Sequence, residues 1–452
     1  MKEQVKNKKA SPWGYLPHLE GVFGMVRTYV WSFSSLIFKT LGARNSVVGY
    51  VNFLQMPLSL RALWAPAVER LGTFRQVVLG SLLLSSLCGT AIGGSILMGV
   101  TNLWIIAGLF LAMVIVVSVL DISYMGYKMS VLSTKEIEYF VAIGNGFFRL
   151  GGLFASTVLV YLVGILYTRS GSYNTAWGIV LLAGALIMFL GWVYLFLKMP
   201  KAHTDSKQLH SDRLTLKSYL KSYVEFFAQP GGGRLVFYFF SAVIGEGILM
   251  GMKIPMLLDA PENGGLGMDL SAIGIMTPVV MGTMIVFGVF GGVYLKKHGL
   301  QKVFFRMGLW MFLPNICFSL LARFPTVAMF TFELSKATSA PVIVYPWVLT
   351  AMVLEMAGYA FAFACYKAFE AMVSKSSVRH KGTYGAIIGS LNLLGLTIGS
   401  GLSGVLQEKV GYFWLFNISI IVSIPGWIMI LFLPVKQIME KTKQQDMEES
   451  VT

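Results

Sequence analysis

Apolar runs separated by short polar turns recur along the chain, and each run is long enough to cross a membrane. A hydrocarbon core of about 30 Å needs roughly 20 predominantly apolar residues in a helix. No cleavage pattern follows the first run, so we expect it to remain as a membrane helix. The pattern predicts twelve helices, at 11–38, 46–64, 77–99, 103–129, 138–166, 177–197, 235–258, 271–294, 303–321, 341–366, 383–406 and 412–433.

The longest polar stretch, 198–233, divides these helices into two sets of six. We therefore predict an N-terminal bundle at 1–197, a cytoplasmic linker at 198–234, and a C-terminal bundle with a cytoplasmic tail at 235–452. From Leu214 the linker becomes amphipathic, which fits a helix on the membrane surface and, equally, a helix packed on the bundle. Its apolar face contains Leu216, Leu220, Tyr223, Val224 and Phe227.

An internal repeat relates the two sets of helices. Glu20 aligns with Glu246 and Gly72 aligns with Gly299, each at the same place in its set. Because six helices precede the linker, both sets start on the same side of the membrane. The repeats are therefore predicted to run parallel.

The basic residues follow the predicted sides of the membrane. The chain is 56% hydrophobic and 13% charged, with 36 Lys and Arg and a net charge of +15. If both ends are cytoplasmic, 27 of the basic residues fall in inner segments and six in outer loops. This asymmetry predicts a multi-pass protein of the cell inner membrane with both termini in the cytoplasm. It also accounts for the positive charge without a nucleic-acid partner.

Two predicted helices carry the same pair of opposite charges at the same spacing. Glu20 and Arg27 are seven residues apart in the first helix, and Glu246 and Lys253 are seven apart in the seventh. Seven residues are almost two turns, so each pair shares one helix face. Charges inside a bilayer usually face a protein interior or a water-filled path. We expect the two pairs to face each other across a cavity between the halves; a purely structural ion pair is the alternative.

The fourth and fifth helices carry a further set of charges. Asp121 and Lys128 are again seven residues apart, and Arg149 lies near the predicted middle of the fifth helix. Asp121 and Arg149 lie at similar depth on adjacent helices, so we expect them to form a switchable ion pair. A carboxylate released from its partner can take up a proton near neutral pH. Such a group is what proton coupling requires.

Other intramembrane polar residues are weaker candidates. Tyr124, Glu355 and Asn392 are expected to contact the cavity, although an Asn that bridges helices is an equal alternative. The candidates for solute binding or proton coupling are therefore Glu20, Arg27, Asp121, Tyr124, Arg149, Glu246, Lys253, Glu355 and Asn392.

The turn between the second and third helices contains charges around a glycine. Glu69 and Arg70 precede Gly72, and Arg75 follows it. This arrangement resembles the loop that acts as a conformational latch in the major facilitator superfamily. A charged turn that only reaches for the membrane surface is the alternative.

Three short motifs of the first half stand out together: Asp121, Ile122, Tyr127 and Lys128 on the fourth helix, Arg149, Leu150 and Gly151 on the fifth, and the segment from Leu63 to Pro66 before Glu69 and Arg70. In these motifs the chain resembles the muropeptide permeases, the AmpG-like branch of the major facilitator superfamily. The resemblance covers the first half of the chain well and the second half mainly in helix count. It implies proton-coupled import of N-acetylglucosamine-anhydro-N-acetylmuramic acid, with or without peptide.

These observations predict an all-α membrane protein of twelve helices in two parallel six-helix repeats. It would import a polar or anionic solute, such as an anhydro-muropeptide or an amino-sugar derivative, with protons and by alternating access. Arg27, Lys253 and Arg149 would engage the solute, while Asp121, Glu20 and Glu246 balance those cations or carry the proton. A ferric-siderophore permease is the alternative.

The other classes of protein fit the sequence less well. No helix supplies a nucleophile with a base, so a membrane enzyme or scramblase is disfavoured. The three cysteines, Cys88, Cys317 and Cys365, lie inside apolar runs, which leaves no Cys-rich metal site. We expect a monomer without cofactor or metal, whose partners are a small-molecule solute, protons and the lipid bilayer.

Overall fold

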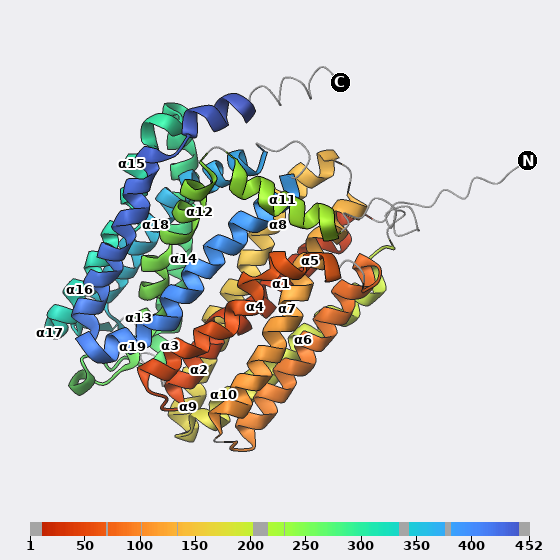
Figure 1. Cartoon of the computed structure of the whole chain (residues 1–452). Helices are drawn as coiled ribbons and strands as arrows, with labels where there is room; N and C mark the ends of the chain where they lie inside the picture. Colours follow the sequence, from red (N-terminus) through yellow and green to blue (C-terminus); the bar gives the residue numbers. More distant parts are fainter. Residues whose placement is uncertain are drawn as a thin grey trace, which may run out of the picture.

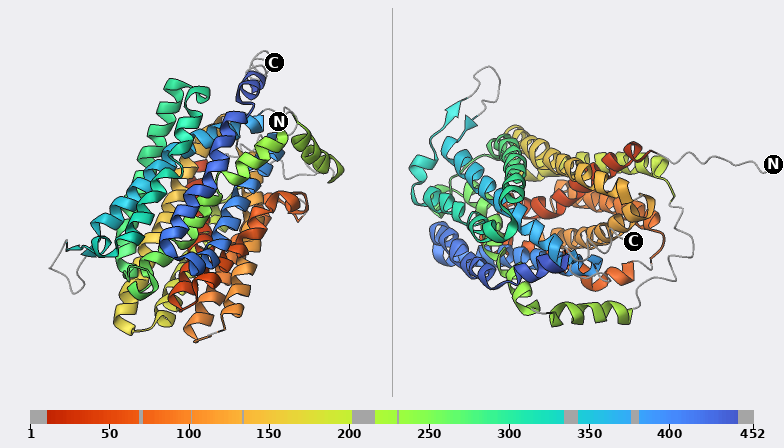
Figure 2. Two further views of the ribbon diagram at one scale, coloured as in Figure 1. Left: turned by 60° about the vertical axis from the view of Figure 1, so that its left-hand side comes forward. Right: turned by 90° about the horizontal axis from the view of Figure 1, so that it is seen from above.

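The computed structural model describes eight segments of the chain: 11–68, 71–100, 102–132, 134–201, 216–229, 231–333, 343–375 and 381–442. The described segments form one bundle of long helices that run side by side (Figure 1). The described chain, residues 11 to 442, begins and ends at the same end of the bundle (Figures 1 and 2). We refer to the other end as the closed end, for reasons given below.

The first half of the bundle contains the helices before α11. They are η1 (Pro12–Gly14), α1 (Leu16–Thr28), η2 (Tyr29–Phe33), α2 (Ser34–Thr40), α3 (Asn45–Val51), η3 (Asn52–Gln55), α4 (Met56–Ser59), α5 (Arg61–Val68), α6 (Phe74–Leu97), α7 (Leu103–Val131), α8 (Thr134–Phe154), η4 (Ala155–Leu159), α9 (Val160–Ser170) and α10 (Tyr173–Lys198).

The second half follows α11 (Leu216–Ala228) and contains one short hairpin beside its helices. Its elements are α12 (Gly232–Ser241), α13 (Ile244–Leu258), η6 (Pro261–Asn263), α14 (Leu270–His298), α15 (Leu300–Leu309), η7 (Leu313–Asn315), α16 (Ile316–Arg323), α17 (Pro325–Ala328), the antiparallel strands β1 (Phe332–Glu333) and β2 (Ile343–Val344), α18 (Pro346–Lys375), α19 (Lys381–Met429) and η8 (Ile430–Phe432). A last helix begins at 435 and continues to 442.

The membrane crossings agree with the apolar pattern of the sequence. Nine helical segments of the described chain are long and apolar enough to span a membrane. The last, Tyr384–Phe432, contains two crossings because the backbone turns at Gly411, where φ is 74°. Two further segments, 16–40 and 45–68, also run along the bundle in Figure 1. The twelve predicted helices are confirmed.

The first helix is not regular throughout. A π-helical turn, η2, separates α1 from α2 and leaves backbone carbonyl groups to be satisfied by other donors. The buried amide of Gln55, from the neighbouring crossing, donates a hydrogen bond to the Val30 carbonyl in this turn. Inside a membrane, an irregular backbone is tolerated where other protein groups satisfy it in this way.

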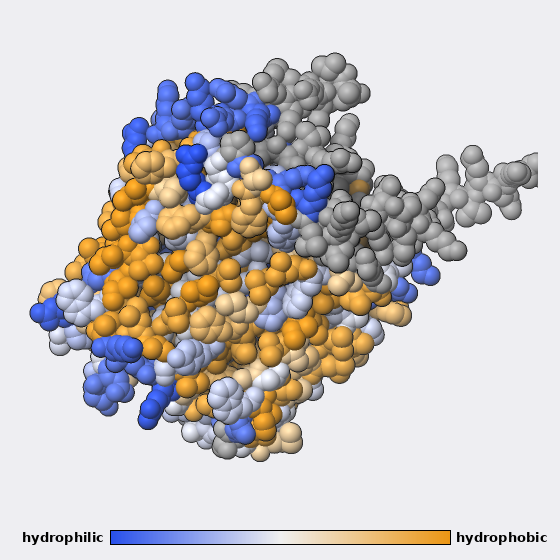
Figure 3. Space-filling view, in the orientation of Figure 1, coloured by the Kyte–Doolittle hydropathy of each residue, from blue (hydrophilic) through white to orange (hydrophobic). Residues whose placement is uncertain are grey.

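The outer surface of the bundle suits a lipid environment. Figure 3 shows apolar residues over most of the flank and polar residues gathered towards the ends. On α14, for example, Val286, Val289, Phe290 and Val293 are all exposed. Exposed apolar side chains in this number are expected where the solvent is hydrocarbon.

The amphipathic helix of the linker forms as α11 and lies across the bundle axis (Figures 1 and 2). Phe226 is fully buried and packs edge-on against Tyr384, with ring centroids 4.9 Å apart. Val224 and Phe227 are exposed. The helix is thus packed on the bundle through Phe226, and its placement on a membrane surface stays a prediction.

The two halves touch closely at the closed end. A Cβ atom added at Gly404 of α19 would lie 1.7 Å from the Asn45 carbonyl oxygen of α3. One added at Gly164 of α9 would lie 2.6 Å from the backbone nitrogen of Ser271 in α14. Only glycine permits such approaches. The halves are therefore in backbone contact at this end along two helix pairs.

Candidate functional site

The first half pairs its charges in a two-rung ladder between α1 and α7. Lys128 Nζ lies 3.2 Å from Glu20 Oε1, and Arg27 Nη1 lies 3.5 Å from Asp121 Oδ1. These helices are the first and fourth crossings, so they run in opposite directions. Each carries an acid seven residues before a base, and antiparallel packing therefore sets each acid beside the base of the other helix.

The Glu20–Lys128 rung of this ladder is buried, and both of its charged groups have additional polar contacts. Glu20 and Lys128 are both buried, and Lys128 Nζ also donates to Tyr124 Oη at 2.7 Å. The Tyr124 hydroxyl in turn interacts with the Glu20 carboxylate. Glu20 and Tyr124 were predicted as site residues, and the structure brings them together around Lys128. A buried ion pair with this many hydrogen bonds is compatible with a structural role.

The second rung carries an additional cation. Asp121 forms a second ion pair, with Arg61 of α5, so one carboxylate serves two guanidinium groups. Arg27 also lies over the Trp31 ring, 6.0 Å from its centroid. Asp121, Arg27 and Arg61 all keep about a fifth of their side-chain surface exposed. Sequence reasoning missed Arg61, which lies near the end of the predicted helix 46–64.

The predicted pairing of Asp121 with Arg149 is wrong. Arg149 Nη1 instead contacts Met284 Sδ of α14 at 3.0 Å, and Arg149 also interacts electrostatically with Tyr359 of α18. The prediction matched the two residues by depth in the membrane, but depth does not fix the direction in which a side chain leaves its helix. Arg149 is exposed and lies between the halves, where its charge has no acidic partner at ion-pair distance among the described residues.

Among its described residues, the second half has one such rung. Lys253 Nζ lies 2.8 Å from Glu355 Oε2, between α13 and α18. Glu246, seven residues earlier on α13, interacts with Glu355 and Lys253 and faces Asn315. Glu246, Glu355 and Asn315 are each 1% exposed, and Lys253 is 9% exposed. Two carboxylates therefore share one ammonium group inside the bundle.

A cavity of about 280 Å³ lies between the halves, and we call it the central cavity. Trp31, Asn52 and Gln55 line it from the first half. Lys253 lines it from the second half, together with Met352 and Met356, which precede and follow Glu355 in the sequence of α18. Lys253 thus separates the cavity from the two carboxylates behind it. Arg27 does not line this cavity, although Trp31, on which it stacks, does.

Asn392 occupies a bridging position. Its Nδ2 donates to Tyr366 Oη at 2.9 Å, and the Tyr366 hydroxyl donates to the Phe239 carbonyl at 3.3 Å. Both side chains are buried, and Asn392 is not among the residues that line the central cavity. Of the two interpretations offered by the sequence, the geometry favours a bond between helices.

The latch loop is described only in part. Glu69 and Arg70 lie outside the described residues. Gly72 has a φ of 151°, and its repeat partner Gly299 has a φ of 79°, so both turns use a backbone conformation that favours glycine. Arg75 donates to the Met199 and Phe196 carbonyls, each at 2.9 Å, and so caps α10 within its own half.

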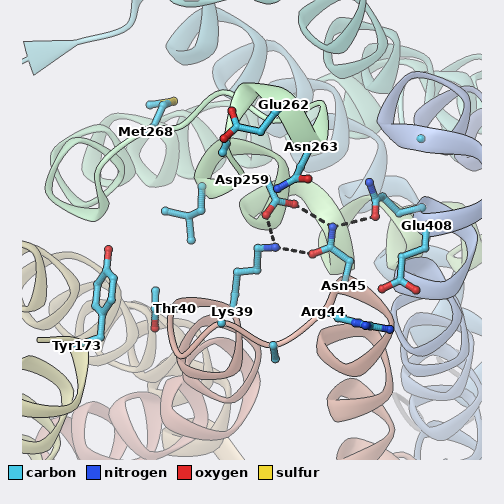
Figure 4. Close-up of a pocket in the computed structure, with 16 residues that line it drawn as sticks. Lys39, Thr40, Arg44, Asn45, Tyr173, Asp259, Glu262, Asn263, Met268 and Glu408 are labelled. Carbon is cyan, nitrogen blue, oxygen red and sulfur yellow. Dashed lines mark hydrogen bonds and ion pairs between the residues drawn. The ribbon is translucent and has the colours of Figure 1, made fainter.

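A polar network that the sequence did not reveal joins the halves at the closed end (Figure 4). Lys39 forms an ion pair with Asp259 and donates to Asn45 Oδ1 at 2.6 Å. Asn45 Nδ2 lies 2.9 Å from Asp259 Oδ2 and 2.8 Å from both Gln407 Oε1 and Tyr412 Oη. Lys39 and Asn45 belong to the first half and the other three to the second.

This network borders a vestibule of about 690 Å³, which Figure 4 shows from within. Arg44, Glu262 and Glu408 also line the vestibule. Lys39 lines both the vestibule and the central cavity. The network therefore stands between the cavity and the closed end of the bundle, in the position of a gate.

Comparison with known proteins places the fold. No protein-family model matches the chain. An uncharacterized protein of Haemophilus influenzae is 26% identical over 410 residues, which are 88% of each chain. The solved structure of a D-xylose-proton symporter is similar with a TM-score of 0.66 at 13% identity, over 95% of this chain and 99% of that one. The nucleoside transporter NupG gives a TM-score of 0.60 at 16% identity, over 95% of this chain and 98% of that one.

At this level of identity, the likeness establishes the fold and leaves the solute open. The similar structures cover nearly all of this chain and are themselves nearly all covered by it. The chain therefore has the major facilitator fold, with twelve membrane-crossing helices in two parallel six-helix repeats.

Proposed function

We propose that this protein is a secondary transporter that imports a polar or anionic solute together with protons. The observation that carries the proposal is the position of Lys253, which lines the central cavity on one side and meets two buried carboxylates on the other. The fold supports the class, since the similar structures include proteins named as a D-xylose-proton symporter and a nucleoside transporter. The halves, 1–197 and 235–452, rock against each other around the cavity.

Cationic side chains support an anionic solute. Arg27 and Arg61 share the single carboxylate of Asp121, and Arg149 lies exposed between the halves. Lys253, a fourth cation, lines the central cavity, and Arg27 contacts the cavity wall through Trp31. A carboxylate on the solute can displace Glu355 from Lys253 and form a charge-assisted bond in its place.

The solute class that we propose is a carboxylate-bearing amino sugar, such as an anhydro-muropeptide. Trp31 on the cavity wall offers a flat surface for a sugar ring. The volume, about 280 Å³, lies at the lower edge of the range for small-molecule sites and favours the smaller members of this class. A ferric siderophore is the alternative from a related branch, and its bulk makes it the poorer fit to this cavity.

The cluster of Glu246, Lys253 and Glu355, which we call the second-half cluster, couples proton movement to solute movement in this proposal. When a solute carboxylate takes Lys253 from Glu355, Glu246 and Glu355 face each other without a counter-charge in apolar surroundings. Like charges in such surroundings favour uptake of a proton by one of them. One anion and one proton then cross together, and release of the solute returns Lys253 to Glu355.

The gate at the closed end supports alternating access. The Lys39–Asp259 ion pair and the bonds of Asn45 join the halves at the closed end. Arg75 and Gly72 of the latch loop, with Glu69 and Arg70, control the other end in this proposal. Import requires the Asn45 network to break when the halves rock apart at the closed end.

The test is uptake into proteoliposomes across an imposed pH gradient. The panel contains anhydro-muropeptides, N-acetylmuramic acid, uncharged amino sugars and ferric siderophores. We expect accumulation of an acidic amino sugar that saturates and collapses when an ionophore removes the gradient. Gradient-independent leakage would point to a channel or scramblase, and chemical conversion of the solute to an enzyme. If no member accumulates, the solute class is wrong.

A further inference from the structure

Polar atoms without partners gather behind Lys253 in the second half. In the described chain, six buried side-chain atoms at this place have no hydrogen-bond partner within 3.5 Å: Glu246 Oε1 and Oε2, Glu355 Oε1, Asn315 Nδ2 and Oδ1, and Ser319 Oγ. Glu246 still lies close enough to Asn315 and Glu355 for weaker polar interactions with both side chains. Glu246, Glu355, Asn315 and Ser319 are each 1% exposed. Buried polar atoms nearly always have a partner, and a group without one indicates a missing water or ion.

These atoms come from four elements of the second half. Glu246 lies in the first turn of α13, and Glu355 lies on α18. Asn315 ends η7, and Ser319 follows it by one turn on α16, so the two share a face. Glu246 interacts with both Asn315 and Glu355. We call the five oxygen atoms of this group, two from Glu246 and one each from Glu355, Asn315 and Ser319, the oxygen cage.

The repeat shows that an acid at this position can be satisfied. Glu20 occupies the equivalent place in the first half and is held by Lys128 and Tyr124. Neither Glu20 oxygen is among the unpartnered buried atoms of the described residues. The lack of hydrogen-bond partners is therefore particular to Glu246 and is not a general consequence of the fold.

The charge of the cage selects a monovalent cation. When both carboxyl groups are ionised, Glu246 and Glu355 carry two negative charges and Lys253 carries one positive charge, which leaves one negative charge in excess. The remaining donors, Asn315 Oδ1 and Ser319 Oγ, are neutral oxygens of the kind that hard cations prefer. A proton on Glu246 also neutralises the charge and lets this carboxyl donate one hydrogen bond, to Glu355 or Asn315, whereas one cation can be contacted by several of the oxygens at once.

We propose that the oxygen cage binds one Na⁺, in competition with the coupling proton. The ion takes oxygen ligands from both carboxylates, the Asn315 amide and the Ser319 hydroxyl. It enters from the central cavity when Lys253 moves aside, since Lys253, Met352 and Met356 form the wall between them. The proposal that Na⁺ binds depends on the oxygen cage alone. The use of Na⁺ as a coupling ion rests on the proposed transport function.

Direct binding tests the cage without any solute. The purified full-length protein in detergent is titrated with ²²Na⁺ and, in parallel, its Tm is followed in NaCl against KCl and choline chloride at constant ionic strength. We expect saturable ²²Na⁺ binding, a Tm that rises with Na⁺ more than with K⁺ or choline, and weaker binding at pH 5.5 than at pH 8.

Three variants locate the ion. Glu246→Gln removes the excess charge and should abolish ²²Na⁺ binding. Ser319→Ala keeps the charges and the fold and should weaken binding by about tenfold or more, the scale found even for outer-shell partners of metal ligands. Glu20→Gln, the matched change in the other repeat, should leave the Na⁺ affinity unchanged.

The proposal is overturned if the wild-type protein shows no ²²Na⁺ binding. It is overturned equally if Glu246→Gln or Ser319→Ala binds Na⁺ like the wild type. If Glu246→Gln does not fold, Ser319→Ala carries the test alone. Loss of pH-driven uptake with intact ²²Na⁺ binding would count against the proposed transport function and leave the cage standing.

Discussion

The two halves of this bundle begin with the same acid and base, seven residues apart, and neutralise them differently. In the first half, α7 supplies both Asp121 and Lys128, so Arg27 and Glu20 each find a partner. In the second half, α18 supplies Glu355 for Lys253, but its next lysine, Lys367, lies twelve residues on and pairs with Glu370 near the helix end. Glu246 is left without a base of its own.

This difference separates structural charge from functional charge. A complete ladder holds α1 and α7 in one arrangement, because moving either helix would strand two buried or half-buried charges. An incomplete ladder has an unsatisfied acid that a proton or another cation can complete. Comparison with the first half thus shows that the second half lacks a basic partner for Glu246. Glu246 lies behind Lys253, which separates the central cavity from the carboxylates.

Breaking the complete ladder should have the largest effect on stability. Lys128→Met leaves Glu20 buried without a counter-charge, and the loss of one partner of a buried pair costs about 3–5 kcal/mol. The measurement is thermal or denaturant unfolding in detergent. Lys367→Met is the matched control in the other repeat; its exposed ion pair is worth at most about 1 kcal/mol. Equal losses in the two variants would contradict a structural first-half ladder.

Removing Lys253 should have the next largest effect, on transport. Lys253→Met takes away the group that links the solute to the carboxylates, and we expect uptake efficiency to fall roughly a hundredfold, or about 2.7 kcal/mol. Transport kinetics in proteoliposomes measure it. Lys297→Met, exposed at the end of α14, serves as the control. A Lys253→Met protein that folds and transports normally would remove Lys253 from the mechanism.

Loosening the gate should shift a conformational equilibrium by a smaller amount. Asp259→Asn breaks the ion pair with Lys39 and weakens the Asn45 network, which should raise the open population several-fold, or about 1 kcal/mol. A single cysteine at Ser35 in the central cavity, in a protein without its native cysteines, reports the change. Labelling by a membrane-impermeant reagent from the closed end should accelerate. An unchanged rate would show that the Lys39–Asp259 ion pair does not hold this end closed.

The smallest effect is expected at Asn392. Asn392→Ala removes the bond to Tyr366, which should lower the free energy of unfolding by about 1 kcal/mol and leave the KM for the solute within about twofold. Transport kinetics and unfolding of the same sample distinguish the outcomes. A large rise in KM with normal stability would return Asn392 to the solute site.

The sequence predicted the helices well because length and apolar composition decide which segments can cross a membrane. It also identified Glu246, Lys253 and Glu355 as candidates, since charge inside a membrane is rare and conspicuous. The sequence did not predict correctly which charged side chains pair with each other. Arg149 was matched to Asp121 by depth, whereas the direction of a side chain depends on helix rotation, which packing sets.

The gate lay beyond sequence reasoning for a related reason. Lys39 and Asp259 stand at predicted loop ends, where charge is common, and more than two hundred residues separate them. One signal could have found the first-half ladder: acid and base seven residues apart on two antiparallel helices must pair crosswise. Glu246 and its missing base would then have stood out as the exception.

In the proposed mechanism the second-half cluster carries the coupling ion, and transport by Glu246→Gln depends on this more than transport by any other variant. Glu246→Gln keeps the shape of the side chain and removes the unmatched charge. In proteoliposomes we measure gradient-driven accumulation and, separately, exchange of solute against solute without a gradient. We expect accumulation to be lost while exchange continues. Accumulation at the wild-type level in Glu246→Gln would rule out the cluster as the site of the coupling ion.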